Sequence, residues 1–143
     1  MKIGNILDHK GEGVVTIDIG QTIKAAADAM AHHQIAALVI TEGAAPVGLV
    51  SERDVVEALA AHGEHGGHRP LRQLTRGDLI SVAPNETIKR AMAMMTHGRM
   101  RHLPVIENGA LAGIVSLGDI VKYRLEELEM ESNVLRDITI ALR

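Results

Sequence analysis

Apolar and polar residues follow a pattern along this chain that occurs twice. Sliding the sequence against itself by 65 positions aligns residues 17–56 with residues 82–121 without a gap. Most non-identical positions in the alignment are conservative exchanges. The identical pairs are Thr22/Thr87, Ile23/Ile88, Lys24/Lys89, Ala26/Ala91, Met30/Met95, Leu38/Leu103, Gly48/Gly113, Val50/Val115, Ser51/Ser116, Asp54/Asp119 and Val56/Val121. The chain therefore contains two copies of one structural unit.

Each copy begins with a short strand and an amphipathic helix. The β-branched runs 14–17 and 80–82 predict strands, because turn residues follow each of them. Apolar residues then recur at spacing i, i+3, i+4, i+7, which gives one apolar face per helix. These residues are Ile23, Ala26, Ala27 and Met30 in the first copy and Ile88, Ala91, Met92 and Met95 in the second.

Two further apolar runs and a second helix complete each copy. The runs are separated by a turn that contains Gly43 in one copy and Asn108-Gly109 in the other, which predicts a hairpin. The runs cover residues 37–40 and 47–50, then 102–106 and 111–115, and the second helices cover 52–61 and 118–142. The predicted fold class is α/β with mixed sheets: two β-α-β-β-α repeats related by pseudo-twofold symmetry, with a long C-terminal helix.

The repeat also predicts the domain organisation. Halves of this size bury little surface alone, so we expect them to share a core. The predicted parts are a first domain at 1–61, a Gly/His-rich linker at 62–70, a second domain at 71–125 and a helical extension at 126–143. His62, His65 and His68 of the linker could suggest a metal site. We interpret the linker instead as an exposed loop without the rigidity that ligand geometry requires, and predict no metal.

Composition excludes several classes of function. Tyr123 is the only aromatic residue and the net charge is -3, so neither base stacking nor a general basic field favours nucleic acid. No cysteine is present, which excludes thiolate chemistry and disulfides. No window resembles a signal peptide or a membrane helix. We expect a cytoplasmic protein with neither nucleic acid nor membrane among its partners.

Each hairpin ends in the pattern Gly, two apolar residues, Ser, two variable residues and Asp, at 48–54 and again at 113–119. This pattern resembles the signature of nucleotide-binding CBS domains, which occur in pairs called Bateman modules. Residues 35–39, 99–105 and 121–126 also look like segments of that family. The resemblance covers nearly the whole chain, and the chain is similar to the stand-alone bacterial type of these proteins. It implies an adenine nucleotide ligand such as AMP, ATP or NAD(H).

The resemblance assigns roles to the Ser and Asp residues of the pattern. Asp54 and Asp119 would accept hydrogen bonds from ribose hydroxyls, while Ser51 and Ser116 add a donor and an acceptor. The N-terminus of the following helix favours a nearby phosphate. Helix capping explains the same residue types without any ligand. Both interpretations stay open at this point.

A basic cluster is the candidate phosphate site. Arg99 and Arg101 would point to one face of a strand and His102 to the other. The first copy has no basic residue at the matching positions, which are Gln34, Ala36 and Ala37. The two clefts therefore cannot be chemically equivalent. A solvated, charge-protected strand edge is the alternative.

The family resemblance adds further candidates. Arg53 precedes the first Asp, Lys10 precedes the first strand, and adenine would lie in an apolar slot around Thr16 and Ser81. Lys10 could equally be an exposed loop charge. The complete set of candidate nucleotide contacts is Lys10, Thr16, Ser51, Arg53, Asp54, Ser81, Arg99, Arg101, His102, Pro104, Ser116 and Asp119.

The C-terminal helix and the absence of catalytic motifs bear on function. Leu125, Leu128, Leu135, Ile138 and Leu142 recur at helical spacing, which predicts packing on a second subunit or back on the same chain. Similar proteins form disc-like dimers, so we expect a homodimer.

No metalloprotease, Walker or nucleophile-elbow pattern occurs, and we predict a sensor rather than an enzyme. The two copies use up the chain, so the regulated activity would belong to an unknown partner. A ligand-free interaction module is the alternative.

Overall fold

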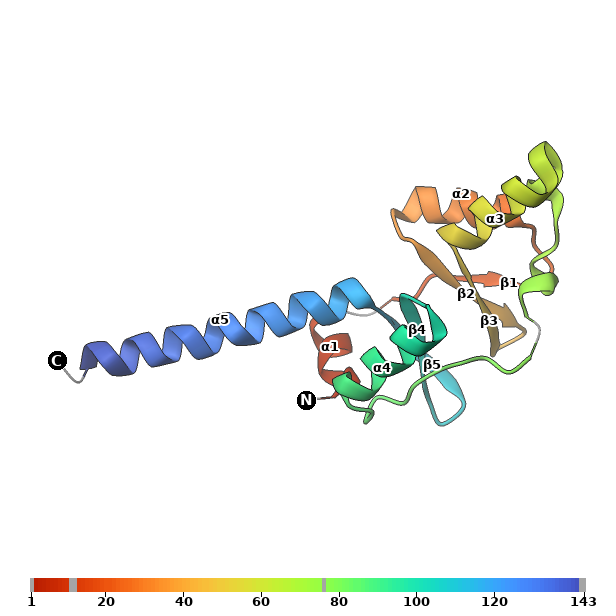
Figure 1. Cartoon of the computed structure of the whole chain (residues 1–143). Coiled ribbons are helices and arrows are strands. Elements are labelled where there is room, and N and C mark those ends of the chain that lie inside the picture. The colour runs from red at the N-terminus through yellow and green to blue at the C-terminus, as the bar shows by residue number, and fades with distance from the viewer. Residues whose placement is uncertain (1, 11–12, 76, 142–143) are drawn as a thin grey trace.

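The computed structural model describes residues 2–10, 13–75 and 77–141. In the first half, β1 (Thr16–Asp18) lies parallel to β2 (Ala37–Glu42), which pairs antiparallel with β3 (Ala45–Ser51). Helices α2 (Ile23–His33) and α3 (Glu52–His62) lie together on this sheet (Figure 1). The second half repeats the arrangement with α4 (Ile88–Gly98), β4 (His102–Glu107), β5 (Ala110–Ser116) and α5 (Leu117–Ala141). The predicted end of α5 at Leu142 and residues 11 and 12 lie outside the described residues.

Strand pairing preserves the 65-residue offset. Ala37 pairs with Ser51 in the first hairpin, and His102 pairs with Ser116 in the second. Both hairpins shift register at the same point, after Ile40 and after Val105. The mixed α/β fold with a repeated unit and a long C-terminal helix is therefore confirmed.

The strand predicted at 80–82 does not form. Only Val82 pairs, in a single parallel bridge with Val105, which matches the Ile17–Ile40 pair of β1 and β2. In the first half the chain stays on the sheet beyond β1, because the Ile19 N–H donates to the Thr41 carbonyl over 2.8 Å. Pro84 occupies the equivalent position and has no N–H to donate. The first strand of the second half is therefore reduced to one residue.

A helix that the sequence reading did not predict begins the chain. Helix α1 (Ile3–Lys10) precedes the first half but packs on the second, where Ile3 and Ile6 are buried in the second core. Its N-terminus is held there because the Ile3 N–H donates to Glu86 and the Gly4 N–H donates to Pro84. Residues 1–10 were expected to belong with the first domain, whereas Ile3 and Ile6 are buried in the second core and Leu7 packs against it.

The segment between the halves is also ordered. Residues 62–70 were predicted as an exposed loop, but they contain the 3-10 helix η1 (Gly63–His68), which lies against α3. A Cβ on Gly66 would lie 2.5 Å from the Ala58 carbonyl oxygen, so only glycine permits this approach. The short 3-10 helix η2 (Leu71–Leu74) follows, and Leu71 is fully buried in the first core. Residues 13–75 thus contain one core, and α1 with residues 77–141 contains another, so the expectation that the two halves share a core is wrong.

Helix α5 extends far beyond the two cores. In Figure 1 it projects away from both sheets as the blue end of the chain. Most of its side chains after Ile120 are exposed, including Leu125, Leu128 and Leu135. Within the described part of the chain, no helix combines the length and the apolarity needed to cross a membrane.

Candidate functional site

The two Ser-to-Asp segments form the turns from β3 to α3 and from β5 to α5. The Ser51 N–H and hydroxyl donate to Asp54 Oδ2 over 2.8 and 3.0 Å. The Ser116 N–H donates to Asp119 Oδ2 over 2.9 Å, and the Asp119 N–H donates to the Ser116 hydroxyl over 3.0 Å. Both carboxylates therefore cap their helices, as the capping interpretation predicted. Each of these contacts that reaches a carboxylate uses Oδ2, which leaves the other carboxylate oxygen of each Asp available for a ligand.

Lys10 makes the two turns unequal. Its ammonium group, at the end of α1, donates to Asp119 Oδ2 over 2.7 Å and to the Ile114 carbonyl over 2.9 Å. Burial raises the pKa of Asp119, but the hydrogen bonds from Lys10 and Ser116 outweigh this effect and hold the pKa below its usual value. By the 65-residue offset of the repeat, the residue that corresponds to Lys10 is Thr75, whose side chain carries no charge. Asp119 is thus neutralised within the protein, whereas Asp54 has no such cation among the described residues.

A pocket of about 670 Å³ lies between the two halves. We call it the interdomain pocket. The first half contributes Ala36, Leu49, Ser51, Glu52, Arg53, Asp54 and Glu57, and the second contributes Arg99, Met100, Arg101 and His102. Six of the predicted site residues therefore meet there: Ser51, Arg53, Asp54, Arg99, Arg101 and His102.

The arginines reach this pocket from a loop rather than from a strand. Helix α4 runs to Gly98, and Arg99 ends it in the left-handed conformation, with φ of 52°. Because β4 begins only at His102, the prediction that Arg99 and Arg101 lie in a strand is wrong. Arg53 donates to Glu57 over 3.0 Å along α3. Within residues 2–10, 13–75 and 77–141, no ion pair joins Arg99 or Arg101 to a carboxylate, so both charges can serve a ligand.

His102 is half-buried between these charged groups. Burial lowers its pKa, and Lys10 lowers it further, against opposing contributions from Asp119 and Glu52. The lowered pKa favours the neutral imidazole, which offers hydrogen bonds rather than charge. The cationic part of the basic cluster consists of Arg99 and Arg101 alone.

The lowered pKa of His102 makes stability depend on pH. A folded-state pKa below the ordinary value contributes stability that is present above pH 6.5 and is lost as the pH falls through the folded value. We expect the melting temperature of the native protein to fall more between pH 7.5 and pH 5.5 than that of the His102→Gln variant. Differential scanning calorimetry at the two pH values measures this difference. Equal falls in both proteins would contradict it.

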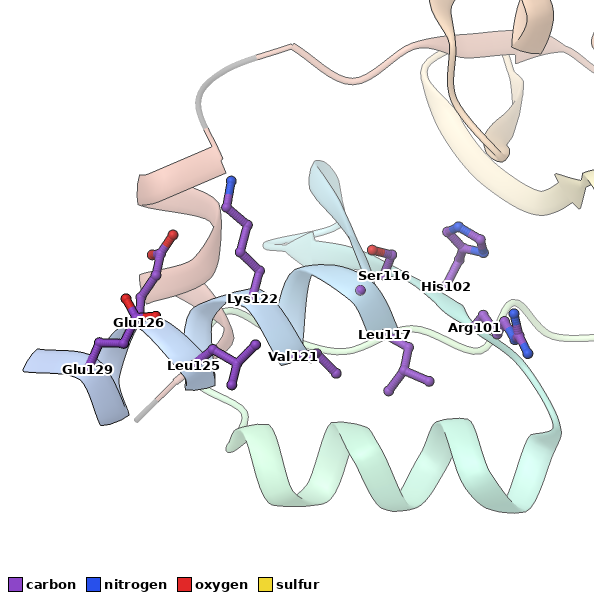
Figure 2. A pocket seen from close by; sticks show the side chains of 10 residues that line it. Arg101, His102, Ser116, Leu117, Val121, Lys122, Leu125, Glu126 and Glu129 are labelled. Carbon is purple, nitrogen blue, oxygen red and sulfur yellow. The ribbon is translucent and has the colours of Figure 1, made fainter. Parts of the chain in front are cut away.

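A second pocket, of about 770 Å³, follows the start of α5. Figure 2 shows Ser116 and His102 at one end of it, with Lys122, Glu126 and Glu129 along the helix. Arg101 and His102 line both pockets. The second pocket has Arg101 and Lys122 beside the two glutamates, whereas the interdomain pocket brings together Arg99 and Arg101, neither of which is paired with a carboxylate among the described residues. The interdomain pocket is the better candidate for an anionic ligand.

The structure does not bring every predicted residue to a pocket. Pro104 is fully buried, and its carbonyl accepts the Val82 N–H over 3.0 Å. Thr16 and Ser81 line neither of the two pockets within the described residues. The sequence reading missed Leu49 and Met100, which give the interdomain pocket its apolar wall. Met100 could have been identified from the sequence, because it is an apolar residue that stands directly between two candidate phosphate contacts, Arg99 and Arg101.

Comparisons with known proteins agree with the fold and the repeat. The CBS domain model matches residues 8–61 and 71–126. The chain is 30% identical over 137 residues to the CBS domain-containing protein YhcV of Bacillus subtilis, covering 96% of each chain. It resembles the crystal structure of a CBS-domain containing protein from Agrobacterium tumefaciens, with 38% identity, a TM-score of 0.82 and coverage of 87% and 99% of the two chains. A CBS domain protein from Pyrobaculum aerophilum, complexed with AMP, gives 25% identity, a TM-score of 0.77 and coverage of 92% and 99%. This chain, with its two repeated halves, belongs to the CBS domain family.

Proposed function

We propose that this CBS pair is a non-catalytic regulatory module that binds an adenine nucleotide in the interdomain pocket. The observation that carries the proposal is the meeting of Asp54 from one half with Arg99 and Arg101 from the other in one pocket. A carboxylate and guanidinium groups suit the two polar ends of a nucleotide, the ribose and the phosphate. The relative from Pyrobaculum aerophilum, which is complexed with AMP, supports this ligand class.

Each part of a nucleotide has a matching group in the pocket. The free oxygen of Asp54 can accept hydrogen bonds from ribose hydroxyls while Oδ2 continues to cap α3. Arg99 and Arg101 supply the charge that a phosphate needs on leaving water. Leu49 and Met100 offer apolar surface for the adenine ring. A volume of about 670 Å³ lies within the usual range for small-molecule sites.

The position of the pocket suggests how binding would act. A nucleotide held by Asp54 and Arg101 would bridge two halves that have separate cores. It would favour the arrangement of the halves in which both contacts are made, because a ligand shifts an equilibrium by its differential affinity. A partner protein that recognises one arrangement would then sense the nucleotide.

A second candidate function is a ligand-free dimerisation module. The exposed apolar residues of α5 favour this function, since surfaces of this kind mark interaction sites. We propose a homodimer in either case, with α5 as the contact. The ligand response separates the two functions.

A thermal-shift panel tests nucleotide binding. AMP, ADP, ATP, NAD(H) and an S-adenosyl compound are added separately at millimolar concentration. A ligand present at 100 times its dissociation constant adds about 2.7 kcal/mol of stability, which raises the melting temperature by roughly 5 to 10 °C. We expect at least one adenine nucleotide to reach this shift, whereas guanine nucleotides serve as the matched control. No shift with any member of the panel would favour the ligand-free module.

A further inference from the structure

Among the described residues, helix α5 exposes eight large apolar side chains beyond Ile120, and four of them, Met130, Val134, Ile138 and Ile140, lie on other faces. The other four lie on one seam together with two polar residues. The positions recur at alternating intervals of four and three residues, and the apolar ones are between 44% and 65% exposed. In order they are Val121, Leu125, Leu128, Ser132, Leu135 and Thr139. Alternating steps of four and three give a period of about 3.5 residues, which is the period of a left-handed coiled coil. In heptad terms, Leu125, Ser132 and Thr139 are a positions, and Val121, Leu128 and Leu135 are d positions.

The charges beside the seam favour one orientation of a second helix. The charged g positions are Arg124 and Glu131, the third g position is the apolar Ile138, and the e positions are Lys122, Glu129 and Arg136. In a parallel, in-register pair each g residue faces the following e residue of the other helix. Arg124 then faces Glu129 of the second copy, and Glu131 faces Arg136 of the second copy. By symmetry the dimer gains four attractive pairs.

The antiparallel alternative places like charges together. The antiparallel register that aligns Leu125 with Leu135 brings e residues opposite e residues and g residues opposite g residues. Glu129 would then face Glu129 of the second copy, and Glu131 would face Glu131 of the second copy. Lys122 would face Arg136 of the second copy. Like-charge contacts of this kind suppress a competing arrangement.

We propose that α5 forms a parallel, in-register, two-stranded coiled coil with a second copy of this chain. The inference rests on the proposed homodimer and specifies its contact surface and orientation. Ser132 and Thr139 are polar residues at a positions, and polar a residues help to fix register at a cost in stability. Both modules lie at the N-terminal end of the coiled coil, side by side, with their interdomain pockets related by the twofold axis.

Single cysteine variants test the orientation, because the native chain contains no cysteine. In a parallel, in-register pair, an a residue faces the same residue of the second copy. We expect Ser132→Cys to form an intermolecular disulfide on mild oxidation, seen as a doubled mass on a non-reducing gel. Asn133→Cys, at the neighbouring outer b position, is the matched control and should remain uncrosslinked. Light scattering of the native protein should give twice the 15.3 kDa chain mass.

Charge reversal tests the pairing independently. Glu131→Arg and Arg136→Glu each create two like-charge contacts per dimer, and each should weaken dimerisation by about three- to tenfold. The double variant restores opposite charges and should return the dissociation constant to near the native value. Analytical ultracentrifugation at low salt measures all three proteins.

The outcomes separate the orientation from the proposals it rests on. A dimer in which Ser132→Cys does not crosslink, or in which the double charge reversal fails to rescue, overturns the parallel coiled coil but leaves the homodimer intact. A monomer or a larger assembly overturns the two-stranded coil altogether. Nucleotide binding is measured separately by thermal shift.

Discussion

Replacing Arg101 with alanine is expected to weaken the binding of AMP by about ten- to a hundredfold and to leave adenosine binding nearly unchanged. The guanidinium lies in the interdomain pocket without a carboxylate partner among the described residues, so a phosphate would be its counterion. A charge-assisted contact of this kind contributes roughly 1.5 to 3 kcal/mol, which converts to that loss of affinity. Isothermal titration calorimetry with both ligands measures the ratio.

Two carboxylate variants provide the matched controls for this prediction. Asp54→Ala should weaken AMP and adenosine alike, because both contain the ribose. Asp119→Ala removes the corresponding helix cap of the other half, outside the interdomain pocket, together with the Lys10 ion pair, so it controls for at least the loss of capping. Equal losses of AMP and adenosine affinity in Arg101→Ala would show that Arg101 does not hold the phosphate. Equal effects of the two Asp variants would indicate capping rather than ribose contact at Asp54.

The sequence predicted the fold because the repeat constrains it twice. Each hairpin pairs residues that are close in the chain, and a glycine-containing turn separates its strands, so local chemistry determines its register. Thr22 and Thr87 mark the helix starts, where their hydroxyls accept from the Ala25 and Arg90 N–H groups. These features depend on neighbours within a few residues, which a sequence shows directly.

The features that the sequence did not predict depend on distant contacts. Lys10 stands next to the first strand in sequence, yet it binds Asp119, because α1 packs on the second half. Nothing in the sequence of residues 1–10 indicates the half on which the helix packs. A local signal for the helix itself was present, since Ile3, Ile6 and Leu7 have helical spacing.

Six of the twelve candidate site residues line the interdomain pocket, and the sequence did not predict that they would meet there. The basic cluster of the second copy and the Ser51–Asp54 turn of the first copy were both identified, but the sequence did not pair them across the two copies. Their meeting in one pocket follows from the packing of the two halves. The apolar run predicted at 102–106 matches the start of β4, but the prediction that Arg99 and Arg101 lie in a strand is wrong, because Gly98 and Arg99 end α4 and leave only two residues before His102.

The packing of α1 on the second half leads to the last prediction. Ile6→Ala is expected to lower the free energy of unfolding of the second half by about 2 to 5 kcal/mol, as truncation of a fully buried isoleucine does. Tyr123, the only aromatic residue, packs against the same core and lies 5.5 Å from the His9 ring, so its fluorescence reports on this half. Urea unfolding followed by tyrosine fluorescence measures the change.

The exposed Asp8 on the same helix provides the control, and Asp8→Ala should change stability by less than about 0.5 kcal/mol. Both variants shorten a side chain of α1, and only one of them removes atoms from the second core. If residues 1–10 served the first half instead, Ile6→Ala would leave the tyrosine transition where it stands in the native protein. A shift of the tyrosine transition in Ile6→Ala alone would show that the second half needs a segment which the chain supplies before the first half begins.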